Sequence, residues 1–225
     1  MDNDTARKVQ SVVRDLSAMK LERSVFEAQW NEIIDFMLPR HGGFGRKREP
    51  GKTNTSRMFD STAPLALRNF TAAMASMITP KTQQWHRLAT THEDLVDNPN
   101  VRAYLDQVTQ ILFAVRYRWR GGFDPQIGAA YQGLGAFGNG VLMIDHHHGQ
   151  GIRYRNIPLS RFWFLEDEAG IVDKAIACWE MSARQAAQKF GIDKLPQTLK
   201  NAYEKNPELK ADFIHCVRPR ADRDA

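Results

Sequence analysis

The sequence is poor in cysteine and has no apolar run near the roughly 20 residues that span a bilayer. Its two cysteines, Cys178 and Cys216, cannot form the disulfide framework of a small secreted domain and are typical of a reducing compartment. Residues 1–20 are charged throughout and contain no apolar secretory segment. These absences predict a soluble intracellular protein without membrane contact.

The short motifs of common enzymes are also missing. There is no HExxH, no GxSxG and no CxxC. The stretch from Gly45 to Gly51, followed by Lys52, imitates a phosphate-binding loop, but five residues separate its glycines where the motif has four. We therefore predict a protein that is not an enzyme and holds no cofactor. ATP turnover that Lys52→Ala abolished would contradict this.

Histidine and acidic clusters do not form a convincing metal site. Residues 146–148 are consecutive histidines, and neighbours in a strand point to opposite faces, so the three cannot converge on one ion. Residues 166–168 are acidic, but the Ala169-Gly170 pair beside them indicates a turn. A hydrolase that uses His147 or Glu166 is one alternative that these patterns leave open.

Charge and composition are those of an ordinary globular protein. Of 225 residues, 31 are Lys or Arg and 26 are Asp or Glu, which gives a net charge of +5, and 42% are hydrophobic. That content can build a core and excludes wholesale disorder. A polyanionic partner is permitted, and its candidate contact is the basic run Arg46, Lys47 and Arg48 with Lys52. A nucleic-acid-binding module without catalysis is therefore the alternative function.

A seven-residue apolar repeat predicts a long amphipathic helix over residues 4–38, which Pro39 ends. The helix either lies on a domain surface or packs on a neighbouring subunit. Residues 40–57 then indicate a flexible basic loop with few apolar anchors, ordered only against a partner. The two seams of the repeat are Val9, Leu16, Trp30 and Met37, and Val12, Met19, Phe26 and Ile33.

Further helices are predicted at residues 63–78 and 98–120, and a shorter one follows Asp124-Pro125. The first of these carries small residues that let another element approach closely. Residues 85–89 are compatible with a short strand. Trp119 is expected to continue the buried stripe of the helix over residues 98–120. The alternation of arginine and aromatic residues at 116–120 is also a pattern that binds single-stranded nucleic acid.

Strand patterns dominate the rest of the chain. Ser182 and Gln185 have the spacing of a capping box, which predicts a short helix that ends at Gly191, and a polar stretch with another short helix follows. Helices followed by a small antiparallel sheet define an α+β fold. The predicted strands cover residues 141–145, 151–157, 161–165, 171–179 and 213–217.

An ordered series of short motifs over residues 21–220 resembles the portal proteins, or head-to-tail connectors, of short-tailed bacteriophages. No single motif is specific, but their order is. The motifs are WNEIIDFMLP at 30–39, FDSTAP at 59–64, ITP at 78–80, WHRL at 85–88, Tyr131, FGNG at 137–140, NIPL at 156–159, GIVD at 170–173, KFG at 189–191 and HCVRP at 215–219. The positions that carry the resemblance best are Trp30, Pro39, Asp60, Ser61, Pro80, Trp85, Gly138, Gly140 and Pro158.

The resemblance implies a structural protein with the wing-like α+β region of a portal subunit. Its segments would be a long N-terminal helix (1–39), the flexible basic loop (40–57), a helical wing part (58–140), an antiparallel β wing part (141–220) and an approach to clip and stem (221–225). The family forms a ring, usually a dodecamer, at one capsid vertex, through which double-stranded DNA is packaged and ejected. Implied partners are other copies, double-stranded DNA, capsid and scaffolding proteins, a tail adaptor and the terminase, but no membrane. The implied location is the virion, and the host cytoplasm during assembly.

Chains of this family are much longer than 225 residues, so this one is expected to be truncated. Because the stem and crown would help to close the channel, we expect residues 1–225 alone to form monomers or loose oligomers rather than a closed ring. Light scattering of this chain tests that expectation, and a homogeneous large ring would contradict it.

Overall fold

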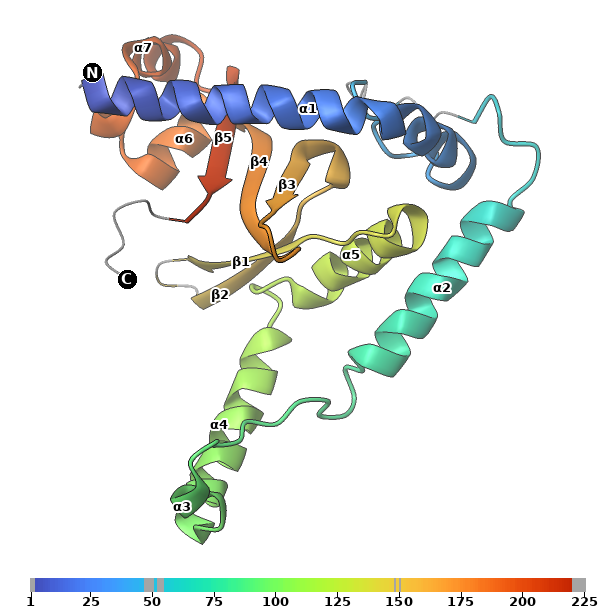
Figure 1. The fold of residues 1–225 in the computed structure, drawn as a ribbon, viewed down its shortest axis with the longest axis vertical. Helices are drawn as coiled ribbons and strands as arrows, with labels where there is room; N and C mark the ends of the chain where they lie inside the picture. The colour runs from blue at the N-terminus through green and yellow to red at the C-terminus, as the bar shows by residue number, and fades with distance from the viewer. Residues whose placement is uncertain (1–2, 47–50, 52–54, 148, 150, 220–225) are drawn as a thin grey trace. The chain divides into compact units, whose positions relative to one another are not determined.

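The chain folds into two compact units in a computed structural model, which describes residues 3–46, 51, 55–147, 149 and 151–219 (Figure 1). One unit comprises Met1–Val25 and Arg161–Ala225, and the other comprises Phe26–Ser160. Helix α1 (Asn3–Met37) contributes residues to both. Helices precede small antiparallel sheets, which confirms the predicted α+β class.

The unit Phe26–Ser160 combines helices with one hairpin. After α1 come α2 (Thr62–Ile78), the short α3 (Glu93–Val96), α4 (Pro99–Arg116) and α5 (Phe123–Phe137). Strands β1 (Leu142–His147) and β2 (Gly151–Asn156) then pair in antiparallel register, with Ile144 opposite Tyr154. Helix α5 packs on α2 and on the hairpin, so it forms the centre of this unit.

Local signals fix the ends of α4 and α5. The Asn98 side chain caps α4 by accepting hydrogen bonds from the backbone N–H groups of Asn100 and Val101, at 3.0 and 3.4 Å. Helix α4 ends at Arg116, before the predicted residue 120, and α5 starts after Gly122, whose positive φ of 69° redirects the chain. This early end decides where Trp119 lies.

Helix α2 approaches α5 closely because Gly135 of α5 has no side chain. A Cβ at Gly135 would lie 2.7–2.8 Å from ring carbons of Phe70 and a methyl of Leu67. The close contact therefore uses large residues of α2 against a glycine of α5. The small residues that the sequence singled out on α2 are mostly exposed: Ala66, Ala72, Ala73 and Ser76.

The other unit is a three-stranded antiparallel sheet in the order β3-β4-β5, covered by helices. Its strands are β3 (Phe162–Glu166), β4 (Val172–Ser182) and β5 (Lys210–Val217). Leu16 and Met19 of α1 pack against Trp163 and Ile176 in the core of this unit. Of the predicted seven-residue repeat, Leu16 and Met19 are buried in this unit, whereas Val9 is exposed.

Two short helices complete this unit, α6 (Ala183–Phe190) and α7 (Gln197–Lys205), with the 3-10 turn Ile192–Lys194 between them. The predicted capping box is confirmed. The Ser182 hydroxyl accepts from the backbone N–H of Gln185 at 3.3 Å, and the Gln185 side chain accepts from the Ser182 N–H at 3.0 Å. Ala186 of α6 and Leu195, which follows the 3-10 turn, are buried together, and Leu199 and Tyr203 of α7 pack against them.

Two strand predictions need correction. The strands after residue 140 do not form one sheet, because Pro158 and the 3-10 turn Leu159–Arg161 interrupt them, and Leu159 is buried in the core of Phe26–Ser160. Residues 85–89 are not a strand. Their backbone is held by a side chain instead, since the Leu88 N–H donates to the Thr109 hydroxyl at 3.0 Å.

Candidate functional site

Phe44 anchors the loop that follows α1 within the unit Phe26–Ser160. Its side chain is only 3% exposed, and its ring centroid lies 4.9 Å from Trp30 and 5.6 Å from Phe137. The Asn31 amide holds the same residue by its backbone: Oδ1 accepts from the Phe44 N–H at 2.9 Å, and Nδ2 donates to the Phe44 carbonyl at 3.2 Å. This loop was predicted to have few apolar anchors, and the burial of Phe44 was not foreseen. The signal for it was a lone aromatic residue among glycines.

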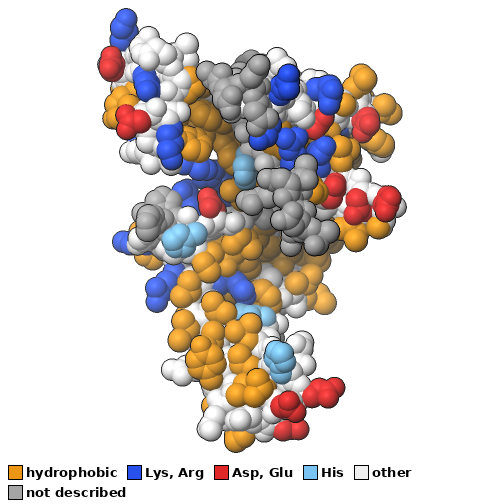
Figure 2. Space-filling model, turned by 60° about the vertical axis from the view of Figure 1, so that its left-hand side comes forward, with side chains coloured by type: hydrophobic (Ala, Val, Ile, Leu, Met, Phe, Trp, Pro, Cys, Tyr) orange, Lys and Arg blue, Asp and Glu red, His pale blue; other side chains and the backbone are white. Residues whose placement is uncertain are grey.

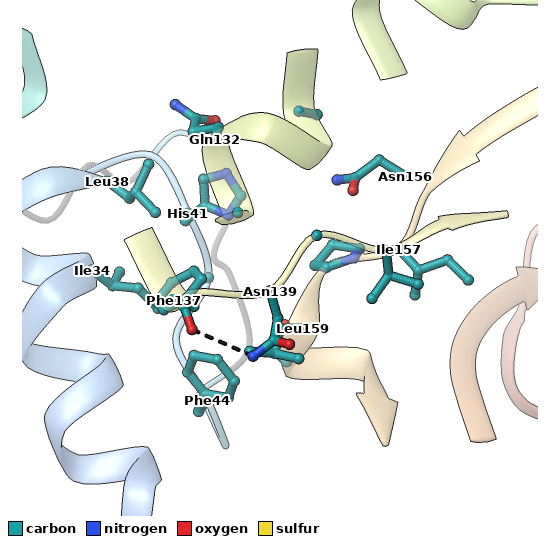
Figure 3. Close-up of a pocket in the computed structure, with 17 residues that line it drawn as sticks. Ile34, Leu38, His41, Phe44, Gln132, Phe137, Asn139, Asn156, Ile157 and Leu159 are labelled. Carbon is teal, nitrogen blue, oxygen red and sulfur yellow. Dashed lines mark hydrogen bonds between the residues drawn. The ribbon is translucent and has the colours of Figure 1, made fainter. Parts of the chain in front are cut away.

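A small cavity adjoins this anchor (Figure 3). Its volume is about 30 Å³, room for one or two water molecules, whereas small-molecule sites typically need about 300–1,000 Å³. Figure 3 shows Phe44, Phe137 and Leu159 gathered on one side, and the Asn139 amide donates to the Phe137 carbonyl at 3.5 Å. The cavity is therefore a packing junction rather than a ligand site.

Of the positions that carry the family resemblance, Gly140 and Pro158 line this cavity, and Trp30 packs on Phe44 beside it. Trp30 is partly buried rather than fully buried. A Cβ at Gly140 would lie 2.6 Å from the carbonyl oxygen of Ala130, so only glycine fits without a backbone shift. Gly138 ends α5 with φ 75°, a left-handed conformation that glycine adopts without strain. These positions serve the fold.

The resemblance positions Pro39, Asp60 and Ser61 lie at helix ends. Pro39 follows α1. The Asp60 carboxylate accepts from the Thr62 backbone N–H at 2.9 Å at the start of α2. Ser61 occupies the cap position by sequence, but its side chain makes no capping hydrogen bond.

The candidate basic contact is only partly described. Arg46 lies 3.7 Å from the carboxylate of Asp35, a buried residue of α1, and Arg57 lies 3.6 Å from its other oxygen. These ion pairs hold both ends of the loop near α1. Lys47, Arg48 and Lys52 lie outside the described residues. A polyanion contact by this run stays a prediction.

Pro80 and Trp85 belong to a second junction, in which side chains hold the segment after α2. The Trp85 indole donates to the Tyr117 hydroxyl at 3.0 Å, and that hydroxyl donates to the Thr79 carbonyl at 3.0 Å. The Thr79 and Tyr131 hydroxyls share a hydrogen bond of 3.1 Å. This Trp85 network joins the extended segment to α4 and α5.

Arg116 is packed among the rings of the Trp85 network. Its guanidinium lies 4.6 Å from the Trp85 ring centroid and 5.6 Å from that of Phe123. Its Nη1 is 3.0 Å from Nδ1 of His86, whose ring stacks on Phe113 at 5.9 Å. Burial, and then the nearby charge of Arg116, lower the pKa of His86 below 6.5.

The lowered pKa of His86 predicts a loss of stability in acid. Well above pH 6.5 the imidazole is largely neutral in both the folded and the unfolded chain. As the pH falls, the unfolded chain takes up the proton first, so the stability that this group contributes is lost. Between pH 7 and 5, the melting temperature of the wild-type chain should fall more than that of His86→Gln. The control His92→Gln replaces an exposed histidine, and its melting temperature should fall as much as that of the wild type. Equal pH dependence in all three chains would contradict the role of His86.

Exposed apolar side chains gather over α3 and α4. Figure 2 shows orange side chains gathered at the foot of the view, where these two helices lie in Figure 1. They include Leu95, Val96, Tyr104 and Ile111. A groove of about 360 Å³ runs beside them, but its Arg87 is paired with Asp106 at 2.8 Å. This surface suits contact with another macromolecule more than catalysis.

Trp119 was expected to be buried, and the structure shows that this is wrong. Helix α4 ends three residues earlier, and the side chain of Trp119 is 84% exposed. The Arg120 guanidinium lies 5.1 Å from the centroid of its ring. The apolar stripe of α4 that Trp119 was expected to continue is half-buried rather than fully buried: Val101, Leu105, Val108, Leu112 and Val115. The fully buried residue of this helix is Thr109.

No group of three or more metal-ligating side chains occurs within the described residues. His146 lies in β1, His148 is outside the described part of the chain, and Asp167 accepts backbone hydrogen bonds from Ala169 and Ile171, as a turn residue does.

Among the described helices, none has both the length and the apolar character to cross a membrane.

The fold and its junctions define an α+β module in which Trp30, Trp85 and Gly140 lie at packed junctions. The exposed apolar surface over α3 and α4 suits contact with another macromolecule. Residues 9–225 match the family described as bacteriophage head to tail connecting protein, and the chain belongs to that family.

Curated relatives agree with this. The portal protein of Salmonella phage epsilon15 is 28% identical over an alignment of 217 positions that covers 95% of this chain and 38% of the relative. The probable portal protein of Bordetella phage BPP-1 is 27% identical over an alignment of 229 positions, gaps included, that covers all of this chain and 40% of the relative. The chain thus spans about two fifths of the length of the curated relatives that it matches.

Proposed function

We propose that this chain acts as part of a portal subunit, the connector at one capsid vertex to which the tail attaches. The observation that carries the proposal is the family match over residues 9–225, together with two portal relatives aligned along nearly the whole chain. The comparisons favour this role over a stand-alone nucleic-acid-binding module.

In this role the chain would be structural and would not catalyse a reaction. The anchoring of Phe44, the fit of Gly140 and the Trp85 network are consistent with it, because all three stabilise a scaffold and none leaves a reactive group at a small-molecule cavity. The exposed apolar residues of α3 and α4 are suitable for contact with neighbouring copies.

The finer assignments are part of the same proposal. The subunit would form a ring, expected to be a dodecamer, through which double-stranded DNA is packaged and ejected. Its partners would be capsid and scaffolding proteins, a tail adaptor and the terminase, which supplies the motor. The protein would reside in the virion and, during assembly, in the host cytoplasm.

The test is the assembly state of the complete product of the gene that encodes this chain. Negative-stain electron microscopy should show annular particles with a central hole, and native mass spectrometry should give one dominant ring stoichiometry. A product that stays monomeric at all concentrations, with no annular particles even after capsid proteins are added, would contradict the proposal.

A further inference from the structure

The turn after α4 places an exposed indole among arginines of two different elements. Arg118, Trp119 and Arg120 form the turn, and two backbone hydrogen bonds hold it. The Arg118 N–H donates to the Val115 carbonyl at 3.3 Å, and the Gly121 N–H donates to the Arg118 carbonyl at 3.0 Å. All three residues are exposed. The turn is therefore a defined structure that presents its side chains outward.

Strand β2 lies directly beside this turn. The Tyr154 backbone N–H donates to the Gly121 carbonyl at 2.8 Å, and a Cβ at Gly121 would lie 3.2 Å from the Ile152 carbonyl. Figure 1 shows the end of α4 next to the β1–β2 hairpin. The turn and the strand are thus direct neighbours within the unit Phe26–Ser160.

Strand alternation brings more positive charge to the same neighbourhood. Tyr154 packs its ring on Phe123 at 4.9 Å, so Arg153 and Arg155 leave β2 on the opposite face. The two guanidiniums are close to each other: burial lowers the pKa of Arg155 most, and the charge of Arg153 lowers it further. Asp145, opposite Arg153 in the hairpin, offsets only part of this charge.

We propose that this basic–aromatic surface, made of Arg118, Trp119, Arg120 and Arg153 with Arg155 beside them, binds single-stranded nucleic acid. Arginine guanidiniums bind phosphate in a bidentate manner, and an exposed indole is a platform for an unpaired base. An acidic protein would use the charges but would not need the exposed ring. The proposal goes beyond the connector role and does not depend on it.

Fluorescence anisotropy of the 225-residue chain with a 5′-labelled 20-mer of dT tests the proposal. We expect binding that weakens with salt. Trp119→Ala should raise Kd about tenfold, since one stacked base typically contributes that much, and Trp119→Phe should restore most of the affinity. The triple variant Arg118→Ala/Arg120→Ala/Arg153→Ala should lower the slope of log K against log salt by about 2, because each phosphate contact contributes about 0.7.

Matched controls separate this surface from net charge. Arg68→Ala/Lys205→Ala/Lys210→Ala removes the same charge from other exposed positions and should leave Kd within about twofold. Melting temperatures check that every variant is folded. The proposal would be overturned by absence of binding, by unchanged affinity in Trp119→Ala, by an equal loss in the control, by duplex DNA binding as tightly as the 20-mer, or by polyglutamate competing equally well.

Discussion

Gly140→Ala is expected to destabilise the unit Phe26–Ser160 by about 3 kcal/mol, the upper range for overpacking. The new methyl would lie 2.6 Å from the carbonyl oxygen of Ala130 and 3.2 Å from its carbon. Both atoms belong to the backbone of α5, so relief requires the helix or the following segment to shift. Urea unfolding followed by tryptophan fluorescence, with hydrogen exchange of α5 amides, measures the loss.

Gly128→Ala is the matched control for this substitution. Gly128 lies in the same helix, and beyond the backbone of its own helical turn a Cβ there would meet nothing within 4 Å. Because alanine favours a helix over glycine, this variant should be as stable as the wild type or more stable, by up to about 1 kcal/mol. If Gly140→Ala were as stable as Gly128→Ala, residue 140 could not lie as close to the backbone of α5 as described.

Phe44→Ala should cost this same unit about 3–4 kcal/mol. The ring fills the space between Trp30 and Phe137, and its removal leaves a cavity that rigid helices cannot easily close. Thermal or urea unfolding of the variant measures the effect, and limited proteolysis should show faster cleavage near residues 40–46.

Phe59→Ala removes the same side chain from a position that is 96% exposed. Surface substitutions of this kind usually change stability by less than about 0.5 kcal/mol. Similar losses in Phe44→Ala and Phe59→Ala would mean that Phe44 does not anchor the loop. A neutral Phe44→Ala would support the original view of a loop with few apolar anchors.

Much of the fold could be predicted because its signals are local. The long helix, the capping box of Ser182 and Gln185, and most strands depend on spacing and caps within a few residues. The ordered motifs identified the family, although each of them alone is weak.

The rest depends on contacts between distant parts of the chain. Whether Phe44 is buried depends on Trp30 and Phe137, which lie far from each other in sequence. Trp119 has the spacing of a buried helical residue, but α4 ends before it. The prediction that it is buried was therefore wrong. The division of the strands into two sheets depends on where Leu159 is buried. The pairing of β2 with the turn after α4, which creates the basic–aromatic surface, is likewise invisible to periodicity.

Immunogold electron microscopy tests the connector role most directly. Antibodies raised against the 225-residue chain would be applied to particles of the phage that encodes it, with the major capsid protein as a positive control. A portal subunit should place gold at a single vertex of each head, where the tail joins, and tail-less heads opened at that vertex should label more strongly. Gold distributed over all vertices or over the whole shell, or absent from particles that the control antibody labels, would contradict the account.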